Sequence, residues 1–134
     1  MRRTLLLLTP LLLAGCVNES ASYFVSGNEH TLTVRAEQDY FWQDEVTLKL
    51  IAARLPDCQR QFTLGKLPAT GLVVELFAAG DNVFTLRAGK QLWQIETQTC
   101  TQLAAPAPNA LGDPLGSFKL SDDKMVFEAA APAK

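Results

Sequence analysis

Three cysteines, Cys16, Cys58 and Cys100, are the most reactive side chains in this chain of 134 residues. A cysteine thiolate can act as a nucleophile, a metal ligand or a redox centre. Redox and zinc motifs place two cysteines close together, with two residues between them, and no two of these three are so spaced. The spacing therefore leaves two kinds of chemistry, the covalent modification of a lone thiol and a disulfide that closes a long loop.

The first cysteine ends a segment that has the features of an export signal. Arg2 and Arg3 precede an apolar run from Leu5 to Ala14, and Gly15 stands directly before the cysteine. The apolar run is about half of the ~20 residues that a membrane-spanning helix needs. The sequence therefore predicts a signal peptide over residues 1–15.

Residues 13–16, LAGC, resemble the lipobox of bacterial lipoproteins. The resemblance covers residues 1–16 only. It implies cleavage before Cys16, a diacylglycerol on its sulfur and a fatty acid on its new amino group, followed by a short tether up to residue 21. In such lipoproteins an Asp after the cysteine favours the inner membrane, whereas Val17 stands here. We therefore expect an anchor in the inner leaflet of the outer membrane, facing the periplasm. The alternative is an ordinary signal peptide with a chance cysteine near its cleavage site.

The two other cysteines would be exported to an oxidising compartment, where an even pair in a small domain forms a disulfide. Cys58 and Cys100 are 42 positions apart, and closing such a loop stabilises a fold by roughly 4 kcal/mol on the chain-entropy model. The alternative is a reactive thiol at Cys58, whose thiolate Arg54 and Arg60 would favour. We predict the disulfide.

The charged and titratable residues do not form a recognisable catalytic or metal-binding motif in the sequence. Removing residues 1–15 leaves 10 basic and 14 acidic residues, a net charge of −4 without a basic cluster, which argues against a nucleic-acid partner. His30 is the only histidine, and we expect it in a solvated turn. We expect no metal site, no cofactor and no enzyme activity.

One aromatic stretch is a candidate binding site. Tyr40, Phe41 and Trp42 are consecutive and are bracketed by acidic residues at positions 39, 44 and 45. On a strand, consecutive side chains alternate between faces, so we expect at least one ring to be exposed at an interface with a basic or amphipathic partner. The alternative is that these rings pack in the core.

The elements that must position these residues are strands. Apolar residues alternate with polar ones from residue 22 onward, as at residues 31–36 and 46–50. Residues 44–55 fit a strand or a helical stripe, and β-branched residues favour the strand. We expect one all-β domain over residues 22–128 and a flexible tail over residues 129–134. The expected architecture is an antiparallel sandwich or partly closed barrel of about six to eight strands with one disulfide.

Residues 72–97 predict a three-stranded antiparallel meander with turns at GDN and GK. The two turns independently place one set of apolar side chains on a common face. That set is Val74, Leu76, Ala78, Phe84, Leu86, Ala88, Trp93 and Ile95. The same register places Glu75 opposite Arg87 on the other face, as an ion pair. A final hairpin is expected around residues 121–124.

These observations lead to a hypothesis of a lipid-anchored, non-enzymatic envelope lipoprotein that binds or supports another envelope component, with an envelope protein as the expected partner. An alternative is an inhibitor of a cell-wall hydrolase, because small lipid-anchored β-barrel lysozyme inhibitors with a disulfide form a family. The Ser-Gly inhibitory loop expected of that family is missing here. A thiol oxidoreductase is the third and poorest alternative.

Overall fold

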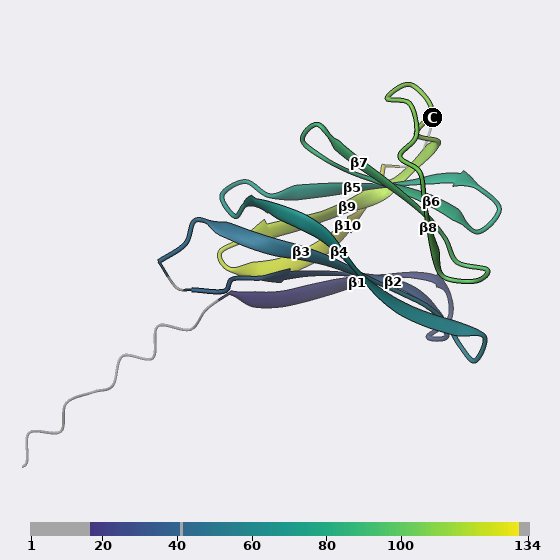
Figure 1. Cartoon of the computed structure of the whole chain (residues 1–134), viewed down its shortest axis with the longest axis horizontal. Coiled ribbons are helices and arrows are strands. Elements are labelled where there is room, and N and C mark those ends of the chain that lie inside the picture. The colour runs from purple at the N-terminus through teal and green to yellow at the C-terminus, as the bar shows by residue number, and fades with distance from the viewer. Residues whose placement is uncertain (1–16, 41, 132–134) are drawn as a thin grey trace, which may run out of the picture.

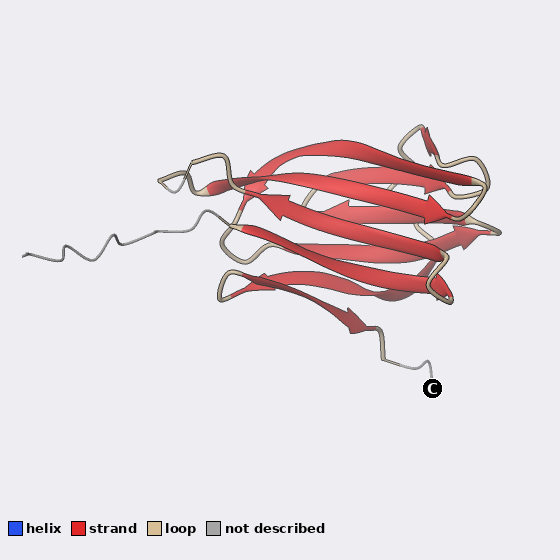
Figure 2. Cartoon of the chain, turned by 90° about the horizontal axis from the view of Figure 1, so that it is seen from below, coloured by secondary structure: helices blue, strands red, loops and turns tan. Residues whose placement is uncertain are grey.

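The computed structural model describes residues 17–40 and 42–131, which form two antiparallel sheets packed face to face (Figures 1 and 2). The signal peptide and Cys16 lie outside the described residues, as does Phe41. Four strands form the first sheet, in the order β1-β2-β3-β4: β1 (Asn18–Ser26), β2 (His30–Glu37), β3 (Glu45–Arg54) and β4 (Cys58–Pro68). Six strands form the second, in the order β10-β9-β5-β6-β7-β8: β5 (Val73–Gly80), β6 (Val83–Ala88), β7 (Gln91–Glu96), β8 (Thr101–Leu103), β9 (Asp113–Ser121) and β10 (Lys124–Ala129).

The two sheets approach each other along one side, where β1 lies against β10. The rings of Tyr23 on β1 and Phe127 on β10 have centroids 5.2 Å apart at this contact. Hydrogen-bonded pairing does not continue from one sheet to the other in the part of the chain that the structure describes, so the sheets are not closed into a barrel. Of the two predicted architectures, the sandwich is confirmed.

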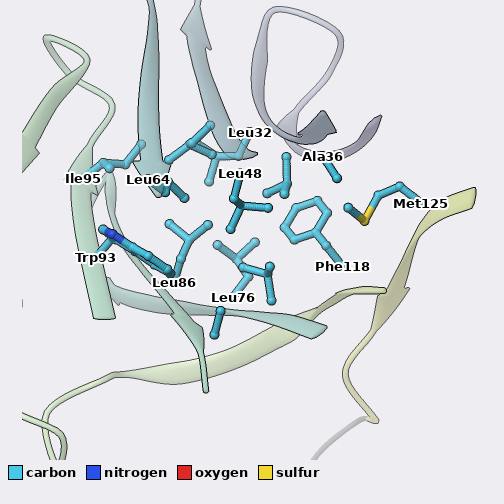
Figure 3. Close-up of a cluster of buried hydrophobic side chains, with 14 of the residues drawn as sticks. Leu32, Ala36, Leu48, Leu64, Leu76, Leu86, Trp93, Ile95, Phe118 and Met125 are labelled. Carbon is cyan, nitrogen blue, oxygen red and sulfur yellow. The ribbon is translucent and has the colours of Figure 1, made fainter. Parts of the chain in front are cut away.

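The core fills the space between the sheets (Figure 3). Side chains alternate between the two faces of a strand, so every second residue of β2 and β3 points into this core. Leu32 and Leu48 are examples, and both are buried. From the second sheet come Leu76, Leu86 and Phe118, each with 0% exposure. Residues 44–55 are therefore a strand and not a helix, and the predicted all-β class is confirmed.

The meander predicted over residues 72–97 is present with its expected register. Leu76 pairs with Leu86, and Leu86 pairs in turn with Trp93. On the outer face, Glu75 lies opposite Arg87 and the two form an ion pair of 2.5 Å. The first turn differs in detail, because Gly80 pairs with Val83 and the chain bulges between residues 78 and 80. On the side of the bulge away from the turn, Ala78 pairs with Phe84 as expected.

The expected number of strands, about six to eight, is too low, because the described residues alone form ten. The expected tether over residues 16–21 is wrong from Asn18 onward, where β1 already begins. β1 and the edge strand β4 are partly or largely exposed along their length, and their apolar alternation in the sequence is correspondingly weak. Strand β8 has only three residues, all exposed. Pairing with a neighbouring strand defines these elements, and local pattern does not reveal it.

The segment after β8 returns across the second sheet to reach β9. Pro108 lies beside Arg87 and Leu92, on the outer face of the sheet. Where the segment rejoins the sheet, Gly112 has a φ of 101°, and a Cβ at this position would overlap the backbone of Ala78. The chain can approach β5 this closely only because residue 112 is glycine.

Candidate functional site

The predicted aromatic site lies in the loop between β2 and β3, which spans residues 38–44. Its first residue, Gln38, ties the loop to the start of β1. The backbone N–H of Gln38 donates to the carbonyl of Val17 at 2.7 Å, and the side-chain oxygen of Gln38 accepts from the N–H of Val17 at 3.2 Å. The side-chain amide of Gln38 also donates to the carbonyl of Gln43, across the loop. One glutamine therefore joins both arms of the loop to the N-terminal strand.

Two of the three aromatic residues lie at the tip of this loop and are exposed. Tyr40 is 51% exposed and Trp42 is 66% exposed, and their rings stack with centroids 4.8 Å apart and planes 18° apart. The tip is held as a turn, in which the N–H of Gln43 donates to the carbonyl of Tyr40 at 3.0 Å. The expectation that these residues lie on a strand is wrong, because β2 ends at Glu37. A turn, and not strand alternation, accounts for their exposure.

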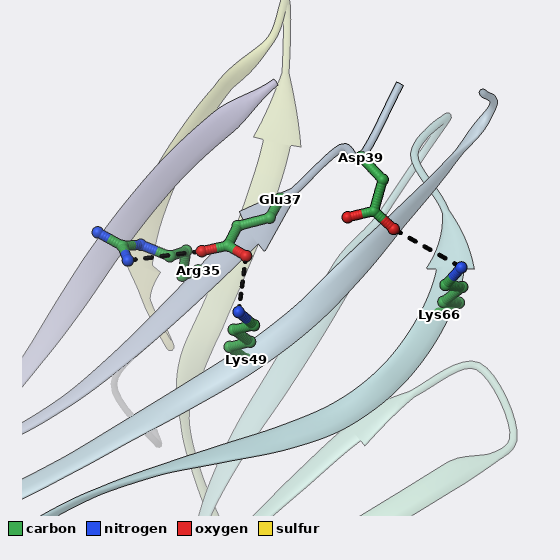
Figure 4. Close-up of polar contacts among 5 residues, drawn as sticks. All are labelled: Arg35, Glu37, Asp39, Lys49 and Lys66. Carbon is green, nitrogen blue, oxygen red and sulfur yellow. Dashed lines mark ion pairs between the residues drawn. The ribbon is translucent and has the colours of Figure 1, made fainter. Parts of the chain in front are cut away.

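Ion pairs lie where the loop meets the first sheet, and one of them joins the loop to β4 (Figure 4). Asp39 forms an ion pair of 3.7 Å with Lys66 on β4. At the end of β2, Glu37 pairs with Lys49 at 2.8 Å and with Arg35 at 3.5 Å. Each partly exposed pair contributes about 1 kcal/mol or less, so these contacts position the loop more than they stabilise the domain.

The loop projects from one end of the domain. In both views it lies at the end where the chain enters β1, and it extends beyond the other turns at that end (Figures 1 and 2). Its far arm is also held, because the carbonyl of Asp44 accepts from the N–H of Ala69 at 2.7 Å. The aromatic tip is thus a braced projection beside the N-terminal end of the domain.

The disulfide lies at the opposite end of the sandwich. Cys58 and Cys100 are bonded, with 5.9 Å between their Cα atoms, and they join the start of β4 to the turn between β7 and β8. The carboxylate of Glu96 accepts hydrogen bonds from Thr99 and Gln98 in that turn. The Thr99 hydroxyl, which also donates to this carboxylate, lowers the pKa of Glu96. The predicted disulfide is confirmed as a link between the two sheets.

The only histidine is buried and not in a solvated turn, which corrects the expectation for His30. Its side chain is 9% exposed, and its Nε2 lies 2.8 Å from the hydroxyl of Thr97, which is fully buried. Burial lowers the pKa of His30, and the positive charge of Arg54 lowers it further. The missed signal is the alternation of β2, which places position 30 on the same face as Leu32.

A shallow depression of about 700 Å³ lies between the β4–β5 segment and the β6–β7 turn. Three charged residues line it, of which Glu75 and Arg87 are paired with each other and Lys90 lies in the turn. The guanidinium of Arg87 also lies over the ring of Phe77, 5.2 Å from its centroid. The Glu75–Arg87 pair is thus engaged within the sheet surface, whereas Tyr40 and Trp42 project from the domain on a braced loop, so the aromatic loop is the stronger candidate for a contact with another molecule.

Within residues 17–40 and 42–131, no three His, Cys, Asp or Glu side chains form a group that could hold a metal ion. The same described part of the chain contains no helix that is long and apolar enough to cross a membrane. Comparisons with protein-family models, with curated proteins and with solved structures find no match.

The sequence identified the aromatic tip but not the residues that hold it. Gln38 and Lys66 contact the loop from its base, and neither has a spacing that marks it in the sequence. The only available signal for Gln38 is that a polar amide directly follows the last residue of an alternating strand. Such a residue can bond to backbone groups that the sheet leaves unpaired.

Proposed function

We propose that this chain is a lipid-anchored lipoprotein of the bacterial cell envelope, whose β-sandwich is a non-enzymatic binding or structural module facing the periplasm. The observation that carries the proposal is the direct attachment of the domain to the expected anchor. Val17, the residue after Cys16, is already hydrogen-bonded to Gln38, and β1 begins at Asn18. The chain leaves no spacer between the lipidated cysteine and the folded domain, so the sandwich would be held at the membrane surface.

The contacts of three titratable residues support a non-enzymatic module. His30, the only histidine, is bonded to Thr97 in the interior between the sheets. The carboxylate of Glu75 is paired with Arg87, and that of Glu128 is paired with Lys119 at 2.6 Å. These side chains serve the fold. Tyr40 and Trp42 project from the end of the domain next to the expected anchor, and the aromatic loop is the surface that we assign to contact with the surrounding envelope.

The anchor is tested by comparing the native protein with the Cys16→Ser variant after expression in a bacterium that processes lipoproteins. The native protein should enter the detergent phase and carry acyl chains at its N-terminal cysteine by mass spectrometry. The variant should remain an uncleaved precursor or become water-soluble, because only the sulfur can accept the diacylglycerol. A cleaved Cys16→Ser protein that still enters the detergent phase would refute the proposal.

The membrane and the class of function are tested separately. Density-gradient separation should place the native protein in the outer membrane, and a Val17→Asp variant should shift toward the inner membrane. Affinity capture of the lipidated protein from a detergent extract should then recover a structural envelope component. Recovery of an inhibited cell-wall hydrolase would favour the inhibitor alternative, and a mixed disulfide with a captured protein would favour the oxidoreductase alternative.

A further inference from the structure

The aromatic loop lies within reach of the membrane that the proposed anchor would enter. Val17 is covalently next to Cys16, its carbonyl accepts a hydrogen bond from Gln38, and Tyr40 follows two residues later. With ~3.8 Å between consecutive Cα atoms and ~5.5 Å across a hydrogen-bonded pair, at most about 17 Å separates the Cα atoms of Cys16 and Tyr40. The acyl chains hold the cysteine at the membrane surface, so the loop is close to the same surface.

The loop also points in the direction in which the membrane would lie. The loop leaves the domain at the end where β1 begins and extends further than the other turns at that end (Figures 1 and 2). Its two arms are braced by Gln38 and by the bond between Asp44 and Ala69. A sandwich that stands on its N-terminal end would therefore touch the membrane first through Tyr40 and Trp42.

The chemistry of the tip matches the headgroup layer of a bilayer. Tyrosine and tryptophan concentrate at membrane interfaces, because each ring has an apolar body and a polar group that remains in contact with water. Here the two rings stack, and each exposes more than half of its surface. Two rings bury much less apolar surface than acyl chains do. They therefore suit a secondary membrane contact, in which the lipid anchor provides most of the affinity.

The charges around the tip select the type of headgroup. Asp39, Asp44 and Glu45, which flank the rings in the sequence, are exposed, and Lys66 forms an ion pair with Asp39. This acidic surround would be repelled by anionic lipids and would be attracted by the ammonium groups of zwitterionic phospholipids.

We propose that Tyr40 and Trp42 rest in the zwitterionic headgroup layer of the membrane that carries the lipid anchor, and so fix the orientation of the domain. This inference rests on the proposed function, because the anchor brings the loop to the membrane. A single lipidated residue leaves the domain able to tilt, whereas a second contact, at most about 17 Å from the first, restricts that motion. The end that carries the disulfide is then turned away from the bilayer.

The test uses Trp42 as its own reporter. The lipidated protein is reconstituted into phosphatidylcholine vesicles that contain brominated phospholipid, and tryptophan quenching is compared with that of a Trp42→Phe variant. Trp93, the only other tryptophan, is 8% exposed in the core. We expect lipid quenching and a blue shift of emission in the native protein and the loss of both in the variant. Adding phosphatidylglycerol should weaken the quenching.

The matched control is Phe24→Ala, which removes a 58% exposed ring from the far part of β1, where Phe24 pairs with Thr31. It should leave the quenching of Trp42 unchanged. Protein that floats with the vesicles without quenching of Trp42 would overturn this inference and leave the anchor intact. Protein that does not float would overturn the anchor and this inference together. Protection of Trp42 in native envelope membranes but not in pure lipid vesicles would assign the loop to a protein partner and overturn the inference.

Discussion

The Nε2 atom of His30 and the hydroxyl of Thr97, 67 positions apart in sequence, form a 2.8 Å hydrogen bond that links the start of β2 to the end of β7. The Thr97 hydroxyl also lies 3.4 Å from the carbonyl of Asn82, to which it can donate. The bond therefore joins the two sheets through the buried interior. It lies toward the end of the sandwich that also carries the disulfide.

Removing either partner of this bond should destabilise the domain. We expect His30→Ala and Thr97→Val each to lower the free energy of unfolding by about 1–3 kcal/mol, because each leaves a buried polar group without its partner. The double variant should lose less than the sum of the two single variants. Urea unfolding of the four proteins measures this coupling, and strictly additive losses would show that the bond contributes nothing.

Stability should fall as the solution becomes mildly acidic. The pKa of His30 in the folded protein is lowered by burial and by Arg54, so the unfolded chain binds a proton at a higher pH than the folded one. The contribution of the neutral imidazole is fully present above the ordinary pKa of about 6.5 and is lost as the pH falls from there toward the folded pKa. Thermal midpoints between pH 8 and pH 5 measure this, and a His30→Gln variant should show a flatter profile over that range.

Breaking the disulfide should have a larger effect than any single surface change. We expect reduction, or the double change of Cys58 and Cys100 to Ser, to lower the free energy of unfolding by roughly 4 kcal/mol, because the unfolded chain regains the freedom of a 42-residue loop. Calorimetry with and without reductant measures the loss. Two alkylatable thiols in the unreduced, denatured export product would contradict the bond.

How far the sequence determines this fold differs from element to element. The meander was predictable because two independent turns require the same register, and Glu75 does face Arg87. β8 and the first residues of β1 were not, because the side chains of β8 are exposed, those at the start of β1 are mostly polar, and backbone pairing holds both segments in the sheet. Alternating hydrophobicity reveals a strand only where one of its faces is buried, so it does not identify a strand at an exposed edge of the sheet.

The candidate site shows the same division. Three consecutive aromatics between acidic residues are conspicuous in the sequence, and Tyr40 and Trp42 are indeed exposed. The reason given for their exposure was wrong, because these residues form a turn. Gln38, which braces that turn, contacts Val17 at a distance of 21 positions along the chain. Such a contact depends on the pairing of β1 with β2, and local spacing does not determine it.

Glycine at position 112 should be irreplaceable. A Cβ there would overlap the carbonyl of Ala78, and the backbone has a φ of 101°. Gly112→Ala should therefore destabilise the domain by more than 2 kcal/mol, in the range of about 3 kcal/mol found for strained backbone sites. Gly27→Ala is the matched control, because Gly27 also has a positive φ, of 57°, but has open space around it. Its loss should be about 1 kcal/mol. Equal losses in thermal unfolding would show that the overlap is relieved by movement of the chain.

The last prediction concerns Gln38, whose side-chain amide makes two different hydrogen bonds that hold the aromatic loop, one through its oxygen and one through its nitrogen. Its oxygen accepts from the N–H of Val17, and its nitrogen donates to the carbonyl of Gln43. Gln38→Glu keeps the acceptor and removes the donor, so the turn that this donor braces should loosen. Amide-exchange protection of the Gln43 N–H, which donates to the carbonyl of Tyr40, should then fall, while that of the Val17 N–H is retained. Gln38→Ala removes both bonds and should reduce protection at both residues, with about 1 kcal/mol lost from the free energy of unfolding.

Gln61→Ala, at an exposed glutamine on β4, is the control for losing a surface amide and should leave both protections unchanged. In the lipidated protein on vesicles, Gln38→Ala should also weaken the lipid quenching of Trp42, because the tip is no longer held in its projecting position. Unchanged protection at Val17 and Gln43 in Gln38→Ala would mean that the backbone bond from Gln38 to Val17 and the turn at Tyr40 hold the loop without the side chain.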